Sequence, residues 1–379
     1  MTFTGDKNEI NISRTWLEID ISALRQNAEI IKRISKCGRF TAVVKADAYG
    51  HGAAEVACAL SDIADSFAVA APCEAFELRR SGIENDILIL GGTAPCMIPE
   101  ILEYGVTPTV FDVETAEIIS DEAGKLGITA GVFIAVDTGM SRIGVTPDEK
   151  GAETVRRISE LSSVRIDGVF THLARADETD RKPTLSQLDR FSGFLSSLSS
   201  LGVEYGQTSV SNSAAALYAY VPFDSVRAGI ALYGISPSDE TPLPEGIRPV
   251  MSMRSRIEQI KEVPAGTGVS YGHTFVTGRK TKLATVYCGY ADGYPRALSG
   301  KGRVLVNGKF APIVGRICMD QLIADVTGIE GVKKNDVVTL LGRDGDNVIT
   351  VEEIADLNGT ITYEILAGFS SPRVPKIYY

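Results

Sequence analysis

The chain contains few of the side chains on which several classes of protein depend. Its 379 residues include one tryptophan and three histidines, and His51, His172 and His273 do not have the spacing of metal ligands. No stretch is long and apolar enough to cross a bilayer, and the first ten residues lack a cationic start followed by an apolar run. We therefore expect no bound metal, and neither export nor membrane insertion. Neither a metalloenzyme nor a hydrolase is favoured.

The chain also has fewer positively than negatively charged side chains, 38 against 48. The formal net charge is −10 and the pI is near 5.0, so the phosphates of a nucleic acid or of an anionic membrane would be repelled. The six cysteines show no Cys-x-x-Cys pair and no framework spacing. This pattern predicts reduced thiols in a cytoplasmic protein rather than disulfides.

What the chain does contain is a regular alternation of strand-like and helix-like stretches between residues 40 and 235. Helical patterns cover, for example, 113–126, 148–161 and 184–201. The short apolar and β-branched runs are 41–44, 66–70, 86–90, 107–111, 131–136, 165–170, 207–210 and 225–229. Eight such runs with helices between them predict an α/β fold, a (β/α)8 barrel. A doubly wound open sheet is the alternative, but no Gly-x-Gly-x-x-Gly follows the first run.

The pattern changes after the proline-rich stretch 236–249, which is typical of a linker. Short runs separated by Gly, Asn and Asp then predict an antiparallel β-domain that closes with a helix near 351–357; they are 251–261, 281–288, 303–306, 310–318, 322–326 and 336–341. We expect a barrel domain over 1–240 and a β-domain over 241–379. An early strand near 12–20 is expected to join one of the two.

Lys45 is the most informative single residue. It follows the apolar run 41–44 and precedes a turn rich in glycine. A buried ammonium is unfavourable, so a lysine there has a lowered pKa or reacts, most usefully as a Schiff base with an aldehyde cofactor. The alternative is a structural lysine at a strand end, paired with Asp47. This run alone leaves both interpretations open.

Small polar residues follow the last two barrel runs, where (β/α)8 enzymes commonly bind a phosphate. Asn212 and Ser213 follow the seventh run, and Gly229 and Ile230 follow the eighth. Each of these alone is more often a plain helix cap or turn. Together with Lys45 they describe a phosphorylated aldehyde that is held at both ends.

Seven ordered segments resemble those of bacterial alanine racemases. They are 43–52, 136–144, 171–177, 227–234, 268–272, 289–293 and 315–320. The resemblance spans nearly the whole chain and both expected domains. It implies a homodimer with shared active sites, built from a (β/α)8 barrel and a β-domain. It also implies pyridoxal 5′-phosphate as cofactor and interconversion of L- and D-alanine, which supplies D-alanine for peptidoglycan.

The resemblance also implies roles for individual residues. Lys45 becomes the Schiff-base lysine, and Tyr271 from the other subunit becomes the second base. Racemisation of the cofactor aldimine then has one base on each face. The residues expected to bind the cofactor are Lys45, Tyr49, His172, Asn212, Ser213, Arg227, Gly229, Ile230 and Tyr363. Those expected to meet the substrate are Arg142, Met319 through its backbone, and Tyr290, which lines the small pocket.

Arg227 narrows the expected chemistry. The resemblance places its guanidinium at the pyridine nitrogen, to which a permanently charged group does not readily donate a full proton. The ring is then a poor electron sink, which favours proton transfer over transamination or decarboxylation. Because an ordinary tyrosine has a pKa near ~10, Tyr271 needs a cationic neighbour to act at neutral pH. His172 beside Arg227 is expected to relay or hold that charge.

Three positions depart from the family pattern. Many members carry a carbamylated lysine where this chain has Ala135, and that lysine braces the arginine equivalent to Arg142. We therefore expect an anion such as chloride, or another carboxylate, beside Arg142. Ser141 replaces the usual glycine, and Pro372 replaces a common tyrosine. The alternative functions are a serine or broad-specificity amino-acid racemase and, less favoured, a related pyridoxal-phosphate-dependent decarboxylase.

Overall fold

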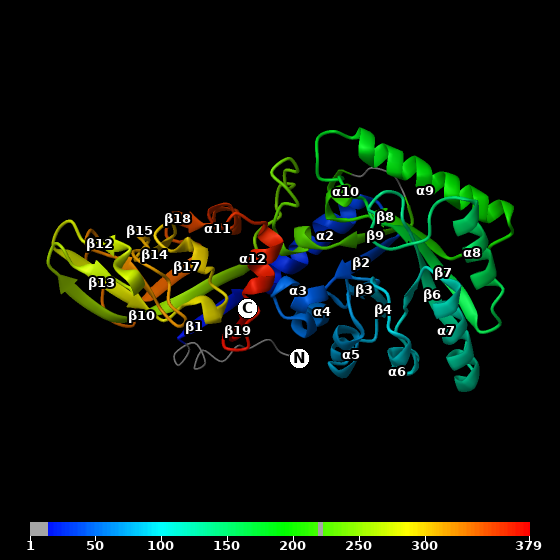
Figure 1. Ribbon diagram of the computed structural model, residues 1–379, viewed down its shortest axis with the longest axis horizontal. Coiled ribbons are helices and arrows are strands. Elements are labelled where there is room, and N and C mark those ends of the chain that lie inside the picture. Colours follow the sequence, from blue (N-terminus) through cyan, green and yellow to red (C-terminus); the bar gives the residue numbers. More distant parts are fainter. Residues whose placement is uncertain (1–13, 219–222) are drawn as a thin grey trace. The chain divides into compact units, whose positions relative to one another are not determined.

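The protein divides into two compact units (Figure 1). This computed structural model describes residues 14–218 and 223–379. The barrel unit comprises Ala23–Ala48 and Ala53–Pro249. The β-unit comprises the described residues up to Ser22, the short segment Tyr49–Gly52, and Val250–Tyr379. By its contacts, therefore, the segment that begins four residues after Lys45 belongs with the β-unit.

Eight parallel strands form the sheet of the barrel unit, in the order β4-β3-β2-β9-β8-β7-β6-β5. They are β2 (Arg39–Val43), β3 (Ser66–Val69), β4 (Asp86–Ile89), β5 (Thr109–Val110), β6 (Ala130–Val136), β7 (Val164–Thr171), β8 (Gln207–Ser211) and β9 (Ser225–Ala228). Leu88 forms a parallel bridge with Thr107, and the Ile89 N–H donates to the Thr107 carbonyl at 3.0 Å. The two outer strands thus nearly close the barrel, which confirms the predicted fold. β5 is shorter than expected because Pro108 has no N–H for the ladder.

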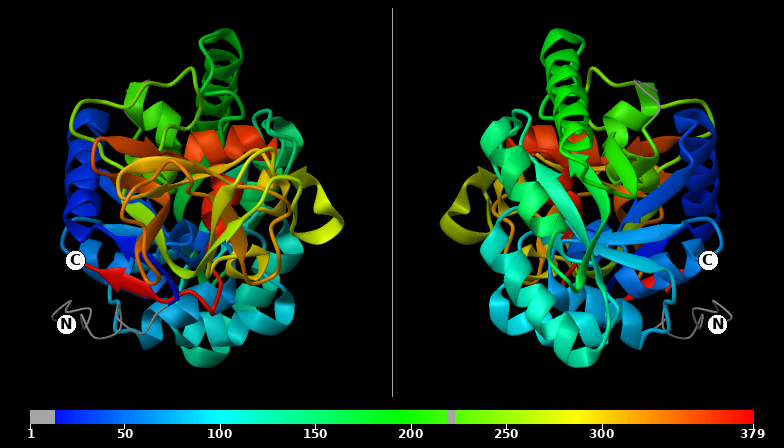
Figure 2. Two further views of the ribbon diagram at one scale, coloured as in Figure 1. Left: turned by 90° about the vertical axis from the view of Figure 1, so that its left-hand side faces the viewer. Right: turned by 90° about the vertical axis from the view of Figure 1, so that its right-hand side faces the viewer.

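Helices surround the strands of the barrel unit (Figure 2). They are α2 (Ile21–Ser35), α3 (Lys45–Tyr49), α4 (Ala53–Leu60), α5 (Pro72–Arg80), α6 (Ile98–Glu103), α7 (Val113–Leu126), α8 (Glu149–Ser159), α9 (Lys182–Ser200) and α10 (Ser213–Tyr218), with 3-10 turns η1 (Pro95–Met97) and η2 (Ile230–Tyr233). The bounds of α7 follow from its caps. Asp112 accepts a hydrogen bond from the Thr115 N–H, and Gly127 ends the helix at φ 67°.

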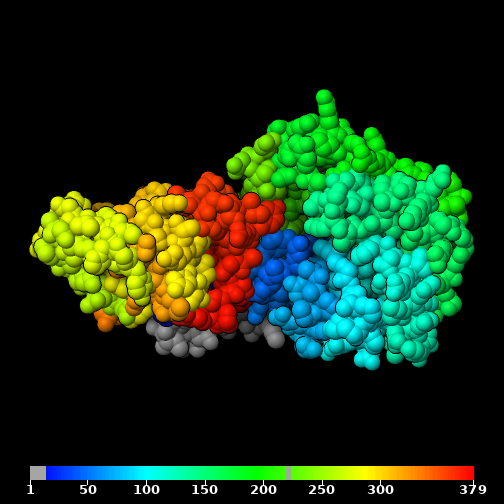
Figure 3. Space-filling view, viewed as in Figure 1, coloured from blue at the N-terminus to red at the C-terminus, as the bar shows by residue number. Residues whose placement is uncertain are grey.

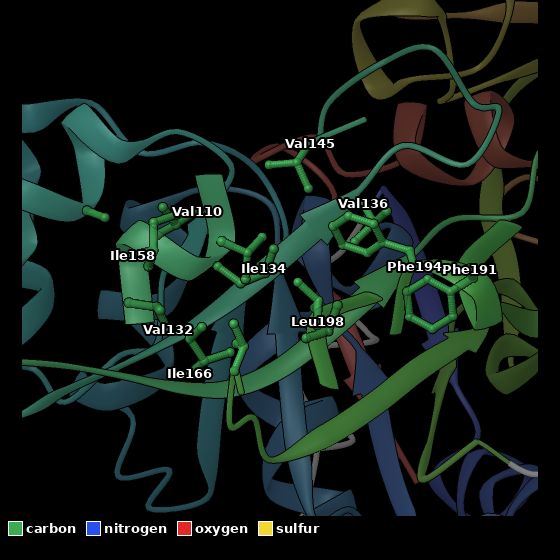
Figure 4. Packing of buried hydrophobic residues seen from close by; sticks show 14 of the residues in the cluster. Val110, Val132, Ile134, Val136, Val145, Ile158, Ile166, Phe191, Phe194 and Leu198 are labelled. Carbon is green, nitrogen blue, oxygen red and sulfur yellow. The ribbon is translucent and has the colours of Figure 1, made fainter. Parts of the chain in front are cut away.

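An apolar cluster joins β5, β6 and β7 to helices α7, α8 and α9 (Figure 4). Ile134 and Val169 in the strands, and Val155 and Phe191 in the helices, are fully buried in it. Burial on this scale stabilises the fold by roughly 2 kcal/mol for each large side chain. The strands are held rigidly, so their carboxyl ends present side chains in fixed positions.

The β-unit contains a mostly antiparallel sheet around β10 (Met251–Val263). Its other strands are β1 (Thr15–Ile19), β13 (Thr281–Val286), β14 (Arg303–Val306), β15 (Lys309–Pro312), β16 (Leu322–Asp325), β17 (Val337–Asp344), β18 (Asn347–Ile349) and β19 (Lys376–Tyr378), and β11 (Gly268–Val269) pairs with β12 (Phe275–Val276). β1 lies between β10, antiparallel, and β19, parallel. The early strand therefore pairs within the β-unit; residues 12 and 13 of its expected range lie outside the described residues.

Two predictions for this unit are wrong. The expected strand 310–318 ends with β15 at Pro312, because proline removes a ladder donor; beyond it Ile313 forms only a bridge with Ala324. The unit also does not close with α11 (Val351–Asn358), since α12 (Thr362–Gly368) and β19 follow. Three 3-10 turns complete it: η3 (Tyr271–His273), η4 (Tyr290–Asp292) and η5 (Arg296–Leu298).

Candidate active site

Lys45 begins an unusual turn directly after β2. Ala46, Asp47, Ala48 and Tyr49 all have left-handed backbone angles, with φ between 52° and 55°. Such angles are disfavoured by about 1–2 kcal/mol for each residue that is not glycine. The turn is held by Glu74, which accepts a hydrogen bond of 2.7 Å from the Ala46 N–H. Backbone strain of this kind is concentrated at functional sites.

The surroundings of Lys45 favour the neutral amine. Burial lowers its pKa, and the positive charges of Arg142 and Arg227 lower it further, while Glu74 acts in the opposite direction. The carboxylate of Asp47, the partner in the structural alternative, accepts from the Ala53 N–H at 2.9 Å at the start of α4. A partly buried lysine with a lowered pKa between two arginines suits a nucleophile or base better than a structural ion pair.

Arg227 lies inside the barrel unit on β9 and is only 5% exposed. Its guanidinium donates to the Ser209 hydroxyl at 2.5 Å and to the Thr171 carbonyl at 2.7 Å. Its charge lies 5.1 Å from the centre of the Phe170 ring. Burial, and then the charge of Arg142, lower the pKa of Arg227 to about 10. It therefore remains a cation at neutral pH.

His172 follows β7 and lies close enough to the same cations to respond to them. Burial is the main cause that lowers its pKa to about 3, and Arg227, Arg142 and Lys45 add to the effect. The ring is thus neutral at pH 7. The sequence predicts that His172 relays or holds positive charge; in this arrangement it can relay a proton, but the positive charge itself stays on Arg227.

The segments after β8 and β9 are tied together by one hydroxyl. Ser213 is 5% exposed, and its Oγ accepts from the N–H groups of Gly229 at 2.9 Å and Ala231 at 3.3 Å. Because both lone pairs are used, its own proton is left to donate. Asn212 caps α10 by accepting from the Ala215 N–H at 3.1 Å, and Ile230 is buried beside them.

These residues fit an anionic, phosphorylated cofactor. Arg142 and Arg227 provide two cationic groups whose charges act on both Lys45 and the neutral His172. The Ser213 hydroxyl provides a buried donor after the last strands, the usual place for a phosphate in such a barrel. A phosphorylated aldehyde would thus find a lysine at one end and a hydrogen-bond donor at the other.

Arg142 lies in the loop that follows β6 and is exposed. Ala135 is 2% exposed within β6, and its carbonyl accepts from the Val145 N–H at 2.9 Å. Ser141, one of the departures from the family pattern, has φ 56°, an angle at which glycine is preferred. Its N–H donates to the Asp137 carboxylate at 2.9 Å, which stabilises the loop in this conformation.

In the β-unit the structure brings Tyr49 and Tyr363 together. Their ring centres are 6.0 Å apart. Tyr49 is 9% exposed, and burial raises its pKa to about 12. Its phenol therefore remains protonated and acts as a hydrogen-bond donor at neutral pH.

Tyr271, Tyr290 and Met319 are exposed on the β-unit, with exposed fractions of 68%, 42% and 53%. The residues around 260–290, yellow in Figure 3, lie at its surface. Backbone hydrogen bonds join the segments that carry Tyr290 and Met319, from the Tyr290 N–H to the Cys318 carbonyl and from the Ala291 N–H to the Met319 carbonyl. These three side chains are therefore accessible to a partner or a ligand.

The run that carries Tyr271, 268–272, has the Gly-x-Ser-x-Gly spacing of a hydrolase nucleophile elbow. The structure does not form such an elbow, which needs a strand, a sharp turn and an α-helix. Ser270 lies between the two-residue strand β11 and the 3-10 turn η3, and its hydroxyl donates to the Arg316 carbonyl at 2.5 Å. The spacing is therefore present in the sequence, but the strand–turn–helix geometry that a hydrolase nucleophile needs is not formed around Ser270.

A strained turn at Lys45 near the buried Arg227 cation, with the buried Ser213 hydroxyl after the last strands, fits a pyridoxal-phosphate enzyme built on a barrel. The family models described as alanine racemase, N-terminal domain and C-terminal domain, match residues 19–237 and 250–378. The chain belongs to the alanine racemase family, whose members are isomerases that act on alanine. The predicted family, enzyme class and cofactor are confirmed.

Individual relatives agree with this assignment. An alanine racemase of Halothermothrix orenii is 44% identical over 96% of each chain. The solved alanine racemase of Clostridium difficile 630 superposes with a TM-score of 0.92 at 38% identity, covering 97% of this chain and 96% of that one. The alanine racemase of Bartonella henselae, solved with covalently bound pyridoxal phosphate, has a TM-score of 0.87 at 31% identity over 97% and 100% of the chains.

Sequence reasoning missed several residues that shape the site. Glu74 holds the lysine turn by accepting from the distant Ala46 N–H, and Ser209 accepts from Arg227 on the neighbouring strand. The ring contact between Tyr49 and Tyr363 joins residues more than 300 positions apart. None of these has a local motif, since each depends on a contact made only in the folded chain.

Proposed function

We propose that Lys45 and Tyr271 are the two bases of alanine racemisation. Lys45 Nζ removes or returns the substrate α-proton on one face, and Tyr271 Oη does so on the opposite face. Pyridoxal phosphate, when bound, supplies the electron-withdrawing group that acidifies this proton. The lowered pKa of Lys45 is the single observation that best supports the proposal, since burial and the charges of Arg142 and Arg227 favour the free amine that a base requires.

The remaining residues bind and orient. The cofactor phosphate is held by Ser213, by the backbone of Gly229 and Ile230, and by the phenols of Tyr49 and Tyr363. Asn212 fixes the start of α10 for this purpose. The Arg227 guanidinium stays charged near the cofactor ring, and neutral His172 relays protons beside it. Arg142 and the backbone N–H of Met319 bind the substrate carboxylate, and Tyr290 limits the side chain to about the size of methyl.

We also propose that two copies of the chain share their active sites, with Tyr271, Tyr290 and Met319 contributed by the partner. The exposure of these three side chains supports this arrangement. The protomer division is proposed as a barrel domain over 1–240 and a β-domain over 241–379, with the early strand added to the latter. No helix in the two described ranges is long and apolar enough to span a membrane. The six unpaired thiols support a cytoplasmic role in supplying D-alanine for peptidoglycan.

Exchange of the α-proton in heavy water tests the proposed function. Each alanine enantiomer is incubated with the holoenzyme, and both deuterium uptake and product chirality are followed. Exchange with inversion in both directions is expected. Release of carbon dioxide would instead identify a decarboxylase, and faster turnover of serine than of alanine would identify the broad-specificity alternative.

A further inference from the structure

The β-unit contains a fully buried carboxylate that the proposed reaction does not use. Asp292 is 0% exposed. Its two oxygens lie 2.7 and 2.9 Å from Nη2 of Arg14, which donates to them, and Oδ2 also accepts from the Gly289 N–H at 3.0 Å. Arg373 Nε lies 3.6 Å from Oδ1. A buried charge is retained only where such partners compensate for its lost solvation.

Asp292 ends the short turn that carries Tyr290, and this turn is built against the segment that carries Met319. The Tyr290 N–H donates to the Cys318 carbonyl at 3.1 Å and the Ala291 N–H to the Met319 carbonyl at 2.9 Å. A Cβ atom on Gly289 would lie 2.3 Å from the Met319 carbonyl oxygen. The two segments are therefore held in a fixed arrangement by backbone hydrogen bonds, and only glycine at position 289 permits their close approach.

The same cations reach the second segment. Arg373 Nη2 donates to Asp320 Oδ1 at 2.6 Å, and Arg14 Nη2 lies 3.8 Å from that oxygen. Asp320 directly follows Met319. Ion pairs of Arg14 and Arg373 with Asp292 and Asp320 thus link the two segments. Arg14 itself immediately precedes β1, which lies inside the sheet between β10 and β19.

From these contacts we infer that the Arg14–Asp292 ion pair is a positioning device that sets where the Met319 N–H and the Tyr290 ring meet the substrate. The inference rests on the proposed function, which assigns those two groups to the substrate. Neither Arg14 nor Asp292 touches the reacting atoms. Since a misplacement of about 1 Å reduces the productive binding of a substrate strongly, loss of the pair weakens recognition of the alanine carboxylate.

Steady-state kinetics of Arg14→Gln in both directions test this role. We expect KM for L- and D-alanine to rise about tenfold, with kcat changed less than about threefold, because a uniform binding contact is lost. The visible absorbance of the bound cofactor should not change. Arg14→Lys, which retains the charge, should recover part of the KM. Arg303→Gln is the matched control, since Arg303 makes a similar pair with Glu353 at 2.7 and 2.9 Å within the same unit.

A folded Arg14→Gln protein with KM within twofold of the wild type would overturn the inference, as would an equal rise in KM for Arg303→Gln. If Arg14→Gln does not fold, Arg373→Gln replaces a half-exposed side chain and should raise KM about threefold; an unchanged KM there counts against the inference. Absence of α-proton exchange by the wild type would remove the proposed function as well. Exchange by the wild type together with an unchanged KM in the variants would remove the positioning role alone.

Discussion

Arg227 donates a hydrogen bond of 2.7 Å to the backbone carbonyl of Thr171, the residue that precedes His172. The bond crosses the barrel unit from β9 to β7 and links the buried cation to the start of the histidine loop. The charge of Arg227 is also one of the causes that keep the pKa of His172 low. Arg227 thus acts on His172 in two ways. Its hydrogen bond holds the residue that precedes the histidine, and its charge lowers the pKa of the imidazole.

Borohydride treatment of the holoenzyme should attach pyridoxal phosphate to Lys45 and to no other lysine. Lys45→Ala should lose the visible absorbance and at least about 10³-fold in kcat, because both the attachment point and one base are removed. Peptide mass spectrometry identifies the labelled residue. A label on a different lysine would show that the assignment is wrong. Lys301→Ala, at an exposed turn, is the control.

Tyr271→Phe should slow α-proton removal from L-alanine by at least about 10²-fold, while removal from D-alanine continues through Lys45. Deuterium uptake into each enantiomer, measured before much product forms, separates the two steps. Tyr104→Phe, in the barrel unit, should behave as the wild type. Equal and mild losses for both enantiomers would rule out a mechanism with two bases.

Ser213→Ala should weaken cofactor binding by about tenfold, because it removes the hydroxyl that donates to the phosphate and that also holds the Gly229 and Ala231 N–H groups in place. At saturating pyridoxal phosphate, kcat should return close to the wild-type value. Titration of the apoenzyme with cofactor, followed by absorbance, gives the dissociation constant. The matched control is Ser196→Ala on the exposed side of α9. An unchanged dissociation constant for Ser213→Ala would contradict the proposal that Ser213 binds the phosphate.

His172 should make the stability of the apoenzyme sensitive to acid. Its pKa is about 3 in the folded chain and near 6.5 when unfolded, so the unfolded state binds more protons between these values. Stability therefore falls as the pH drops below 6.5, by up to about 1.4 kcal/mol per pH unit from this residue, and its contribution is constant at higher pH. Urea unfolding at pH 7 and pH 5 should show a smaller loss in His172→Gln than in the wild type. The exposed His273→Gln should match the wild type, and an identical loss in all three proteins would refute the shift.

Chloride should lower KM for alanine if an anion beside Arg142 takes the place of the carbamylated lysine that many family members carry where this chain has Ala135. At constant ionic strength, exchanging gluconate for chloride should reduce KM by about threefold, since an ordered anion holds the exposed Arg142 guanidinium in place. Initial rates at several chloride concentrations provide the measurement. A KM that does not respond to chloride would indicate that Arg142 is held by other means.

Much of the fold could be predicted because it depends on local patterns. The predicted helix over 113–126 matches α7 residue for residue, since Asp112 and Gly127 mark its ends in the sequence. The predicted strand over 310–318 failed because apolar content alone does not show that Pro312 ends the pairing. Strand pairing is a long-range property, and the place of β1 between β10 and β19 follows only from contacts made after folding.

The sequence by itself determined the family, the cofactor and the chemical types of the site residues, because these follow from the order and spacing of side chains along the chain. Only the tertiary structure decided the protonation and the backbone conformation of these residues. It made His172 neutral and lowered the pKa of Lys45, since both effects arise from burial and from the charges of Arg227 on β9 and Arg142 in the loop after β6. It also strained the backbone after Lys45 and placed Asp292 against Arg14, 278 positions away. Charge and burial act through space, so their effects depend on which distant residues the fold brings together.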